Sequence, residues 1–139
     1  MKKNLLYNIY QVGVIHNRDR YASIEIFDEY RDALLGLKEF SHIIVLTWFH
    51  KNDTEEKRNI LRVHPRGDKK NPLTGVFATR SPIRPNPIAL FTCRIVSIRD
   101  NIIQIDKINA FDGSPVIDIK PYIPEEDSVS DVEVPGWLK

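Results

Sequence analysis

A short run of prolines and arginines at residues 75–87 constrains this chain more than any other stretch of its sequence. The run reads GVFATRSPIRPNP and holds three prolines, two arginines and one asparagine. Each proline fixes its own φ and keeps the preceding residue extended, so we predict a stiff loop without regular hydrogen bonding. Such a loop presents Arg80 and Arg84 in set directions at small entropic cost, which suits an anionic ligand. The alternative is a rigid structural turn whose arginines face water.

Elsewhere, apolar and polar residues alternate over short stretches, as they do in half-buried strands. The clearest case is Ala22, Ile24 and Ile26. Residues 28–40 instead place apolar side chains at helical spacing, and Gly36 limits that helix to one or two turns. We therefore predict a mainly β fold, a small antiparallel β-barrel-like domain with one or two short helices. The predicted strands are residues 10–15, 22–26, 42–50, 61–64, 76–78, 89–98, 101–108 and 116–119, with a polar loop at residues 52–58.

The length and composition of residues 1–139 are those of a single globular domain. The lone Cys93 excludes an internal disulfide framework, and its apolar strand context indicates a core residue. The sequence shows no signal-peptide or membrane-spanning pattern, so we expect a cytoplasmic protein. The histidines are not spaced as one compact metal motif, and we expect no metal unless folding assembles a site.

Charge is distributed unevenly along the chain, whose overall net charge is only +1. Residues 57–84 contain eight basic residues against Asp68 alone, a net charge of +7, which leaves −6 for the remainder. A local basic patch on a near-neutral protein indicates contact with a polyanion over a limited area. A solvated charged loop is the alternative explanation.

A second polar cluster, WFHKN at residues 48–52, ends the most apolar of the predicted strands. A strand that ends in this way delivers His50 and Lys51 to the rim of a barrel, where binding sites form. Alternatively, His50 only caps the strand and Trp48 belongs to the core.

Two further clusters lie near the end of the chain. Gly113 permits a tight turn on which Asp112 and Ser114 offer hydrogen-bonding groups, although a plain Asx-type turn would use the same residues. Asp118 and Lys120 share one face of the last predicted strand, so a structural ion pair is the simplest interpretation.

Three segments of the chain together carry a family resemblance: FSHIIVLTWFHKN at residues 40–52, GVFATRSPIRPNPIAL at 75–90 and DGSPVIDIKPYIP at 112–124. In the same order, they resemble the TsaA-like family of S-adenosylmethionine-dependent tRNA (adenine-37-N6)-methyltransferases, of which this chain looks like a short single-domain member. The resemblance runs from roughly residue 10 to residue 127. It implies a compact barrel-like fold, a homodimer, S-adenosylmethionine as cofactor and the threonylcarbamoyl-modified adenosine beside the tRNA anticodon as substrate.

The resemblance also implies cofactor contacts at matching positions, and the chemistry and charge of the side chains suggest further roles. His50 and Arg80 are the candidates for catalysis, His50 as a base for the adenine N6 proton. Arg80 could grip the carboxylate of the cofactor or that of the threonylcarbamoyl group. The basic segment would hold the anticodon-loop phosphates. The expected cofactor residues are His50, Lys51, Arg80, Leu90, Ala110, Phe111, Asp112, Gly113 and Ser114, and the expected RNA residues are Arg62, Arg66, Lys69, Lys70, Arg84 and Asn86.

The sequence departs from the family pattern at its first connection. Family members usually carry a longer segment there, with a Pro-Arg-Gln-like element that touches the cofactor, whereas only residues 16–21 join the first two predicted strands here. Two other functions therefore stay open. One is methylation of another RNA or a small molecule, and the other is a non-catalytic module that binds RNA or S-adenosylmethionine.

Overall fold

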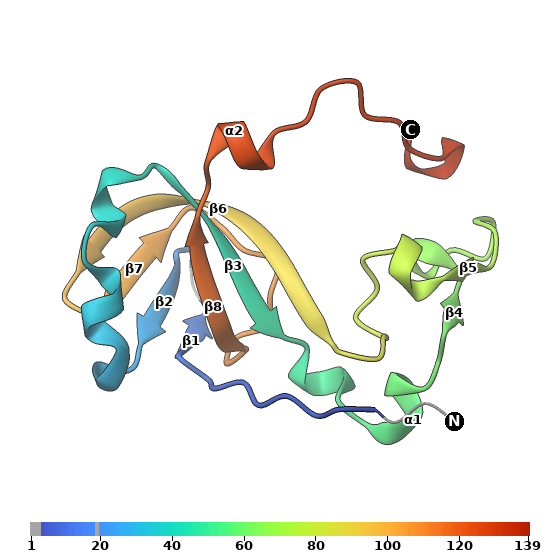
Figure 1. Cartoon of the computed structure of the whole chain (residues 1–139), viewed down its shortest axis with the longest axis horizontal. Coiled ribbons are helices and arrows are strands. Elements are labelled where there is room, and N and C mark those ends of the chain that lie inside the picture. The colour runs from blue at the N-terminus through green and yellow to red at the C-terminus, as the bar shows by residue number, and fades with distance from the viewer. Residues whose placement is uncertain (1–3, 19) are drawn as a thin grey trace.

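The computed structural model describes residues 4–18 and 20–139, and its main feature is an antiparallel sheet that closes on itself (Figure 1). Around the ring the strand order is β1, β2, β7, β6, β3 and β8. The prediction of a mainly β, barrel-like fold is confirmed. The strands of the ring are β1 (Gly13–His16), β2 (Ala22–Ile26), β3 (His42–Trp48), β6 (Ile88–Arg99), β7 (Ile102–Ile105) and β8 (Pro115–Pro121).

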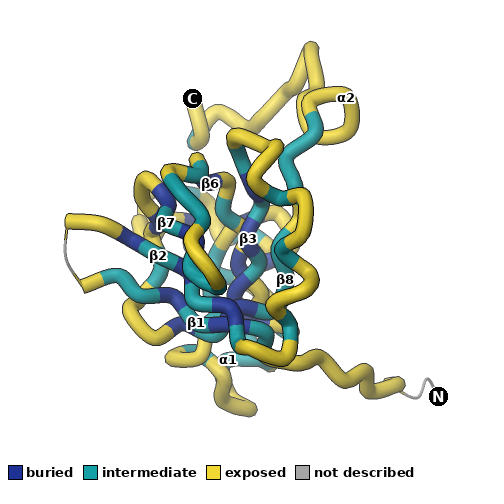
Figure 2. Tube along the Cα trace, turned by 90° about the vertical axis from the view of Figure 1, so that its left-hand side faces the viewer, coloured by how far each residue is buried: buried dark blue, intermediate teal, exposed yellow. Residues whose placement is uncertain are grey.

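The core lies inside the ring, and alternate residues of β1, β2, β3 and β7 are buried there (Figure 2). On β2 the buried residues are Ala22, Ile24 and Ile26, as their alternation predicts. Ile43 and Val45 of β3 face the same interior and are fully buried. Branched aliphatic side chains suit these positions because they pack well on a pleated surface.

The first strand begins later than predicted, at Gly13 instead of Tyr10. Gly13 is buried against β2, and a side chain there would collide with the carbonyl oxygen of Glu25. This close approach explains why glycine stands at the start of the strand.

Strands β6 and β7 form the predicted hairpin, with Asp100 in its turn at a φ of 54°. Cys93 of β6 is 1% exposed, so its prediction as a core residue is confirmed. Burial, aided by the nearby negative charge of Asp106, raises the pKa of the Cys93 thiol to about 11. The thiol is therefore protonated at neutral pH and is a poor nucleophile.

Residues 28–40 form two 3₁₀ helices, η1 (Asp28–Leu34) and η2 (Leu37–Glu39), instead of one α-helix. Leu35, which is not helical, and Gly36, in a left-handed conformation at a φ of 87°, separate them. Tyr30, Leu34 and Leu37 still pack against the barrel core, so the apolar spacing identified the buried face correctly.

A long excursion, residues 49–87, leaves the barrel after β3 and returns at β6, and it lies beside the barrel in Figure 1. Residues 52–58, predicted as a loop, contain α1 because Thr54 Oγ1 accepts a hydrogen bond from the Lys57 amide and caps that helix. Residues 76–78, predicted as a strand, form η5 instead. The elements are η3 (His50–Asn52), α1 (Glu55–Arg58), β4 (Arg62–Val63), η4 (Pro65–Gly67), β5 (Thr74–Gly75) and η5 (Val76–Ala78).

The C-terminal tail leaves the barrel after β8 and contains α2 (Pro124–Asp127) and η6 (Gly136–Leu138). It bends back so that the end of the chain lies over the excursion (Figure 1). Asp118 and Lys120 of β8 form the predicted ion pair, 3.0 Å between Oδ2 and Nζ. Among the described residues, no helix combines the length and apolarity needed to cross a membrane.

Candidate cofactor and RNA site

The proline loop, residues 75–87, is held rigid by its own side chains as well as by its prolines. Thr79 Oγ1 donates to the Val76 carbonyl at 2.9 Å and accepts from the Ser81 amide at 3.2 Å. Arg84 Nη1 donates to the carbonyls of Thr79 and Ser81, at 3.1 and 3.0 Å. The stiffness predicted from the prolines is present, but Arg84 turns toward the loop backbone and closes it.

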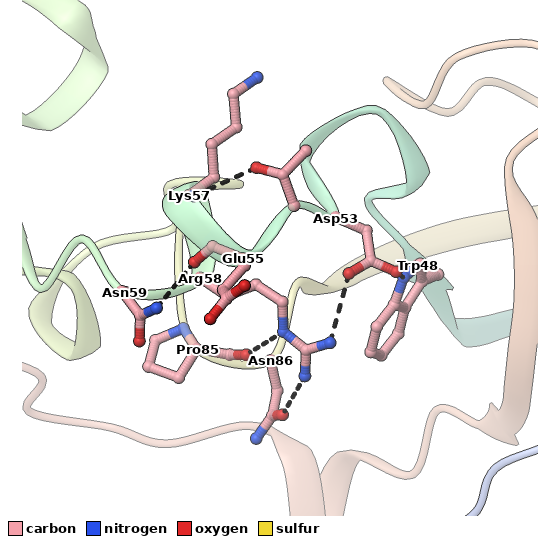
Figure 3. Close-up of polar contacts among 9 residues, drawn as sticks. Trp48, Asp53, Glu55, Lys57, Arg58, Asn59, Pro85 and Asn86 are labelled. Carbon is pink, nitrogen blue, oxygen red and sulfur yellow. Dashed lines mark hydrogen bonds and ion pairs between the residues drawn. The ribbon is translucent and has the colours of Figure 1, made fainter.

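A clamp from α1 fixes the far end of the same loop (Figure 3). Arg58 Nε donates to the Pro85 carbonyl at 2.7 Å, and its Nη2 donates to Asn86 Oδ1 at 3.1 Å. Its Nη1 pairs with Asp53, which in turn accepts a hydrogen bond from Trp48 Nε1 at 3.0 Å. The guanidinium also lies over the Trp48 ring, 5.6 Å from its centroid.

Sequence reasoning missed this clamp because Arg58 looked like one more charge in a basic segment. The available signal in the sequence was the position of Trp48 and Asp53 before the helix cap and of Arg58 after it. Asn86 presents its Oδ1 to Arg58, and its predicted contact with RNA stays a prediction.

A first cavity of about 520 Å³ opens between the proline loop and the chain that follows β7. It brings together Arg80, Leu90, Ala110 and Phe111, four of the predicted cofactor residues, and Arg84 lies beside them. Leu90 is 46% exposed and Phe111 is 59% exposed. Large apolar side chains left open around a cavity indicate a ligand-binding surface.

Another predicted residue, Lys51, lies at the edge of this cavity. It places its Nζ 4.0 Å from the centroid of the Phe111 ring, a cation–π contact that links η3 to the cavity wall. His50 begins η3 and is exposed, directly after Phe49, which lines the cavity. The chain after β3 thus brings Lys51 to the cavity wall, while the position of His50 at the rim stays a prediction. Trp48 is only half-buried, and its indole NH donates a hydrogen bond to Asp53 of the Arg58 clamp.

The turn at Asp112, Gly113 and Ser114 is bonded within the chain and does not line the first cavity. Asp112 Oδ1 accepts from the Asn17 amide at 2.9 Å, and Oδ2 pairs with Arg18 Nε at 2.9 Å. The Asn17 amide, aided by the Arg18 guanidinium, lowers the pKa of Asp112 below its ordinary value. Ser114 is buried and donates to the Phe111 carbonyl at 2.6 Å. Gly113 takes a φ of 85°, which the turn requires.

The short β1–β2 connection supplies the partner of that turn. Asn17 Nδ2 donates to the carbonyls of Ile108 and Ala110, at 3.0 and 2.8 Å. Asn17 therefore positions the chain segment that carries Ala110 and Phe111 into the cavity. Nothing in the sequence near Asn17 revealed this role, because its partners lie more than ninety residues away. Asp19 of the same connection lies outside the described residues.

The remaining predicted RNA residues lie in the excursion and point to solvent. Arg62 is exposed on β4, and Arg66, Lys69 and Lys70 are exposed in the chain between β4 and β5. Their assignment to RNA stays a prediction. Within residues 4–18 and 20–139, no group of three or more His, Cys, Asp or Glu side chains is placed to hold a metal ion.

Comparison with known families identifies the chain. The family model of the tRNA-methyltransferase O N-terminal domain matches residues 12–128. The chain belongs to this family. The resemblance found in the sequence is confirmed.

Archaeal relatives cover most of the chain. A protein of Methanocaldococcus jannaschii, named a probable S-adenosyl-L-methionine-binding protein, is 56% identical over 84% of this chain and 93% of its own length. An S-adenosyl-L-methionine-binding protein of Archaeoglobus fulgidus is 46% identical over 83% of this chain and 78% of that protein. The human tRNA (adenine(37)-N6)-methyltransferase is 40% identical over 79% of this chain, but the match covers 24% of its own length.

Solved structures of the family share the fold. The crystal structure of TrmO from Pseudomonas aeruginosa superposes with a TM-score of 0.72 at 26% identity, over 93% of this chain and 61% of that one. A second TrmO crystal structure gives a TM-score of 0.73 at 27% identity, over 93% of this chain and 63% of that one. The chain therefore spans about three fifths of those solved chains.

Proposed function

We propose that the protein binds S-adenosylmethionine in the first cavity and methylates N6 of the threonylcarbamoyl-modified adenosine at position 37 of tRNA. The observation that carries the proposal is the meeting of Arg80, Leu90, Ala110 and Phe111 around one cavity. The names of the archaeal and human relatives support the cofactor and the reaction.

The donor set of the cavity fits an amphipathic cofactor with a carboxylate at one end. Leu90 and Phe111 provide open apolar surface for a planar ring, while the guanidinium of Arg80 suits bidentate binding of a carboxylate. S-adenosylmethionine supplies an activated methyl group on a sulfonium. Asn17 and Asp112 position this wall, because Asn17 binds the Ala110 carbonyl and Asp112 binds the Asn17 amide.

The substrate must lose one proton from N6 when the new carbon–nitrogen bond forms and the carbon–sulfur bond breaks. His50 is the candidate to accept that proton, because it is exposed and directly follows Phe49, which lines the cavity. Alignment of N6 with the methyl group depends on a rigid wall, which the proline loop provides.

The basic side chains of the excursion bind the anticodon-loop phosphates in this proposal. Arg62, Arg66, Lys69 and Lys70 are exposed around the β4–β5 pair, on the same excursion as Arg80. The protein acts in the cytoplasm and as a homodimer, in which each copy would bring its loops to the other's site.

Isothermal titration with S-adenosylmethionine and a tritiated-methyl transfer assay test this function together. We expect Arg80→Ala to weaken cofactor binding about 10- to 100-fold, the range for a lost charge-assisted hydrogen bond. Arg99→Ala, an exposed arginine at the other end of β6, is the matched control and should bind as the wild type does. Binding that is equal in both variants would contradict the assignment of the cavity.

A second function is favoured by the archaeal relatives that are named only as binding proteins. In that case the cavity would bind S-adenosylmethionine without transferring its methyl group. Transfer assays on threonylcarbamoyl-modified and unmodified tRNA decide between the two. Tight cofactor binding without methylation of either tRNA would support the binding role.

A further inference from the structure

A second cavity, of about 510 Å³, adjoins the first one on the opposite side of the proline loop. Arg80 and Pro82 line both cavities, so the two share a wall. The second cavity is formed by η4, by the start of the proline loop and by the C-terminal η6, segments that lie far apart in the chain. Its volume falls within the roughly 300–1,000 Å³ that is usual for small-ligand sites.

Two aromatic side chains line this second cavity. Phe77, in η5, is 83% exposed although it belongs to a rigid loop with a buried neighbour, Val76. Trp137 comes from η6, where the tail bends back over the excursion (Figure 1). A phenyl ring that is held open on a stiff backbone stabilises the fold little by burial. It is instead available to stack on a planar ligand.

Positive charge accompanies the aromatic rings. Arg66 lines the same cavity from a tight turn in which its own φ is 61° and that of Gly67 is 65°. The turn is closed by a hydrogen bond from the Gly67 amide to the His64 carbonyl, at 3.1 Å. Because the backbone is held in this conformation, the direction of the Arg66 Cα–Cβ bond is fixed.

We propose that the second cavity binds an unpaired nucleobase of single-stranded RNA, stacked on Phe77 and Trp137, with an adjacent phosphate on Arg66. Aromatic platforms with arginines are the usual means of holding unstacked bases, and they tolerate any base because every base has a π-face. The inference rests on the proposed function, in which RNA is the substrate. Because Arg80 and Pro82 line both cavities, this base would lie next to the cofactor cavity, where the adenosine N6 meets the methyl group.

Fluorescence anisotropy with two labelled RNAs tests the proposal. One probe is a short hairpin with an unpaired loop, and the other is a fully paired duplex of the same length. Phe77→Leu and Trp137→Leu keep apolar bulk but remove the aromatic face, so each should weaken hairpin binding about tenfold and leave duplex binding unchanged. Arg66→Gln should weaken binding of both probes, since it removes a phosphate contact.

The matched control is Phe40→Leu, an aromatic residue that lines a different cavity beside η2. It should bind both RNAs as the wild type does. Phe77 is mostly exposed, so its replacement should leave the thermal midpoint unchanged, and a circular dichroism melt checks this. Titration of every variant with S-adenosylmethionine should give the affinity of the wild type.

Other outcomes would overturn the proposal in distinguishable ways. Hairpin binding that survives both leucine variants means that the rings do not stack on a base. Tighter hairpin binding by Trp137→Leu means that the tail blocks this cavity. Loss of cofactor affinity in Phe77→Leu means that the cavity belongs to the cofactor. If the wild type binds cofactor but neither RNA, the nucleobase site fails together with the tRNA substrate, while the cofactor site stands.

Discussion

The proline loop and the turn at residues 110–114 flank the same cavity, but they are held in place by different means. The loop is fixed by three prolines, by hydrogen bonds from Thr79 and Arg84 to its own backbone, and by the Arg58 clamp. The turn is fixed largely from outside, by Asn17 and Arg18 of a distant connection.

The two sides of the cavity therefore depend on different residues. Many local hydrogen bonds support the loop. Among the hydrogen bonds that the structure describes, only those of Arg58 tie its far end to α1. On the other side, one short connection determines where Ala110 and Phe111 lie. The short connection at residues 16–21, which lacks the family's cofactor-contacting element, thus supports the cavity wall formed by Ala110 and Phe111.

The largest effect is expected from Arg58→Ala, which removes hydrogen bonds to Pro85 and Asn86 and the ion pair with Asp53. Displacement of the loop by about 1 Å would lower kcat/KM for methyl transfer about 100-fold. Arg58→Lys should not restore activity, because an ammonium cannot reproduce the fork of the guanidinium. Glu56→Ala, exposed on the same helix, is the control. Near-normal kcat/KM in Arg58→Ala would show that the prolines alone fix the loop.

A smaller effect is expected from Asn17→Ala, which frees the carbonyls of Ile108 and Ala110. Loss of two hydrogen bonds corresponds to about 1–3 kcal/mol, so cofactor affinity should fall about tenfold in isothermal titration. Asn17→Asp should be at least as damaging, because a carboxylate would face two carbonyl oxygens without a donor. If cofactor affinity is unchanged, the turn is supported by other contacts and the comparison fails.

The Asp112 carboxylate makes the support of the turn dependent on pH. Its folded-state pKa is lowered, first by the Asn17 amide hydrogen bond and then by Arg18, so its contribution to stability is present above the unfolded pKa of about 3.9. That contribution is lost as the pH falls through the folded value. Thermal melts should therefore show wild type more stable than Asp112→Asn at pH 6, with the difference vanishing at acidic pH. A difference that stays constant over this range would exclude a role for the charge.

The smallest effect is expected from Trp48→Phe, which keeps an aromatic ring under Arg58 but removes the hydrogen bond to Asp53. Because that bond only orients a partner of the clamp, the free energy of unfolding should fall by less than about 1 kcal/mol in urea titration. Methyl transfer should change by less than about threefold. A loss of methyl transfer as large as that in Arg58→Ala would mean that the clamp depends on Asp53 and its orientation by Trp48.

Much of the barrel could be predicted from local patterns. The alternation of Ala22, Ile24 and Ile26 identified a buried strand face because side chains of a strand point to opposite sides at a fixed period. The hairpin of β6 and β7 followed from two apolar stretches joined by a polar turn. The stretch at residues 28–40 is helical in two short 3₁₀ turns, and Gly36, in a left-handed conformation, stands between them as its effect on helix length predicted.

The candidate site could be predicted only in part. The sequence named Lys51, Arg80 and Leu90 in segments with a family pattern, and Phe111 directly before the third of them; the structure brings these four residues together at one cavity. The assignment of Arg84 and Asn86 to RNA came from charge and polarity and stays a prediction. The sequence did not show that Arg84 bonds to its own loop and Asn86 to Arg58. A residue's polar atoms are free to bind a ligand only where its neighbours in the fold leave them unpaired, and those neighbours can be distant in the chain.

The amino-acid sequence alone predicts a stiff loop within residues 75–87 and short alternating strands over much of the chain. Both properties are local, since proline restricts its own φ and a strand repeats every two residues. What the loop faces depends on the fold of the whole chain. Closure of the barrel brings Asn17 to Ala110, and the tail brings Trp137 to Phe77, because contacts between distant segments follow from packing of the whole chain.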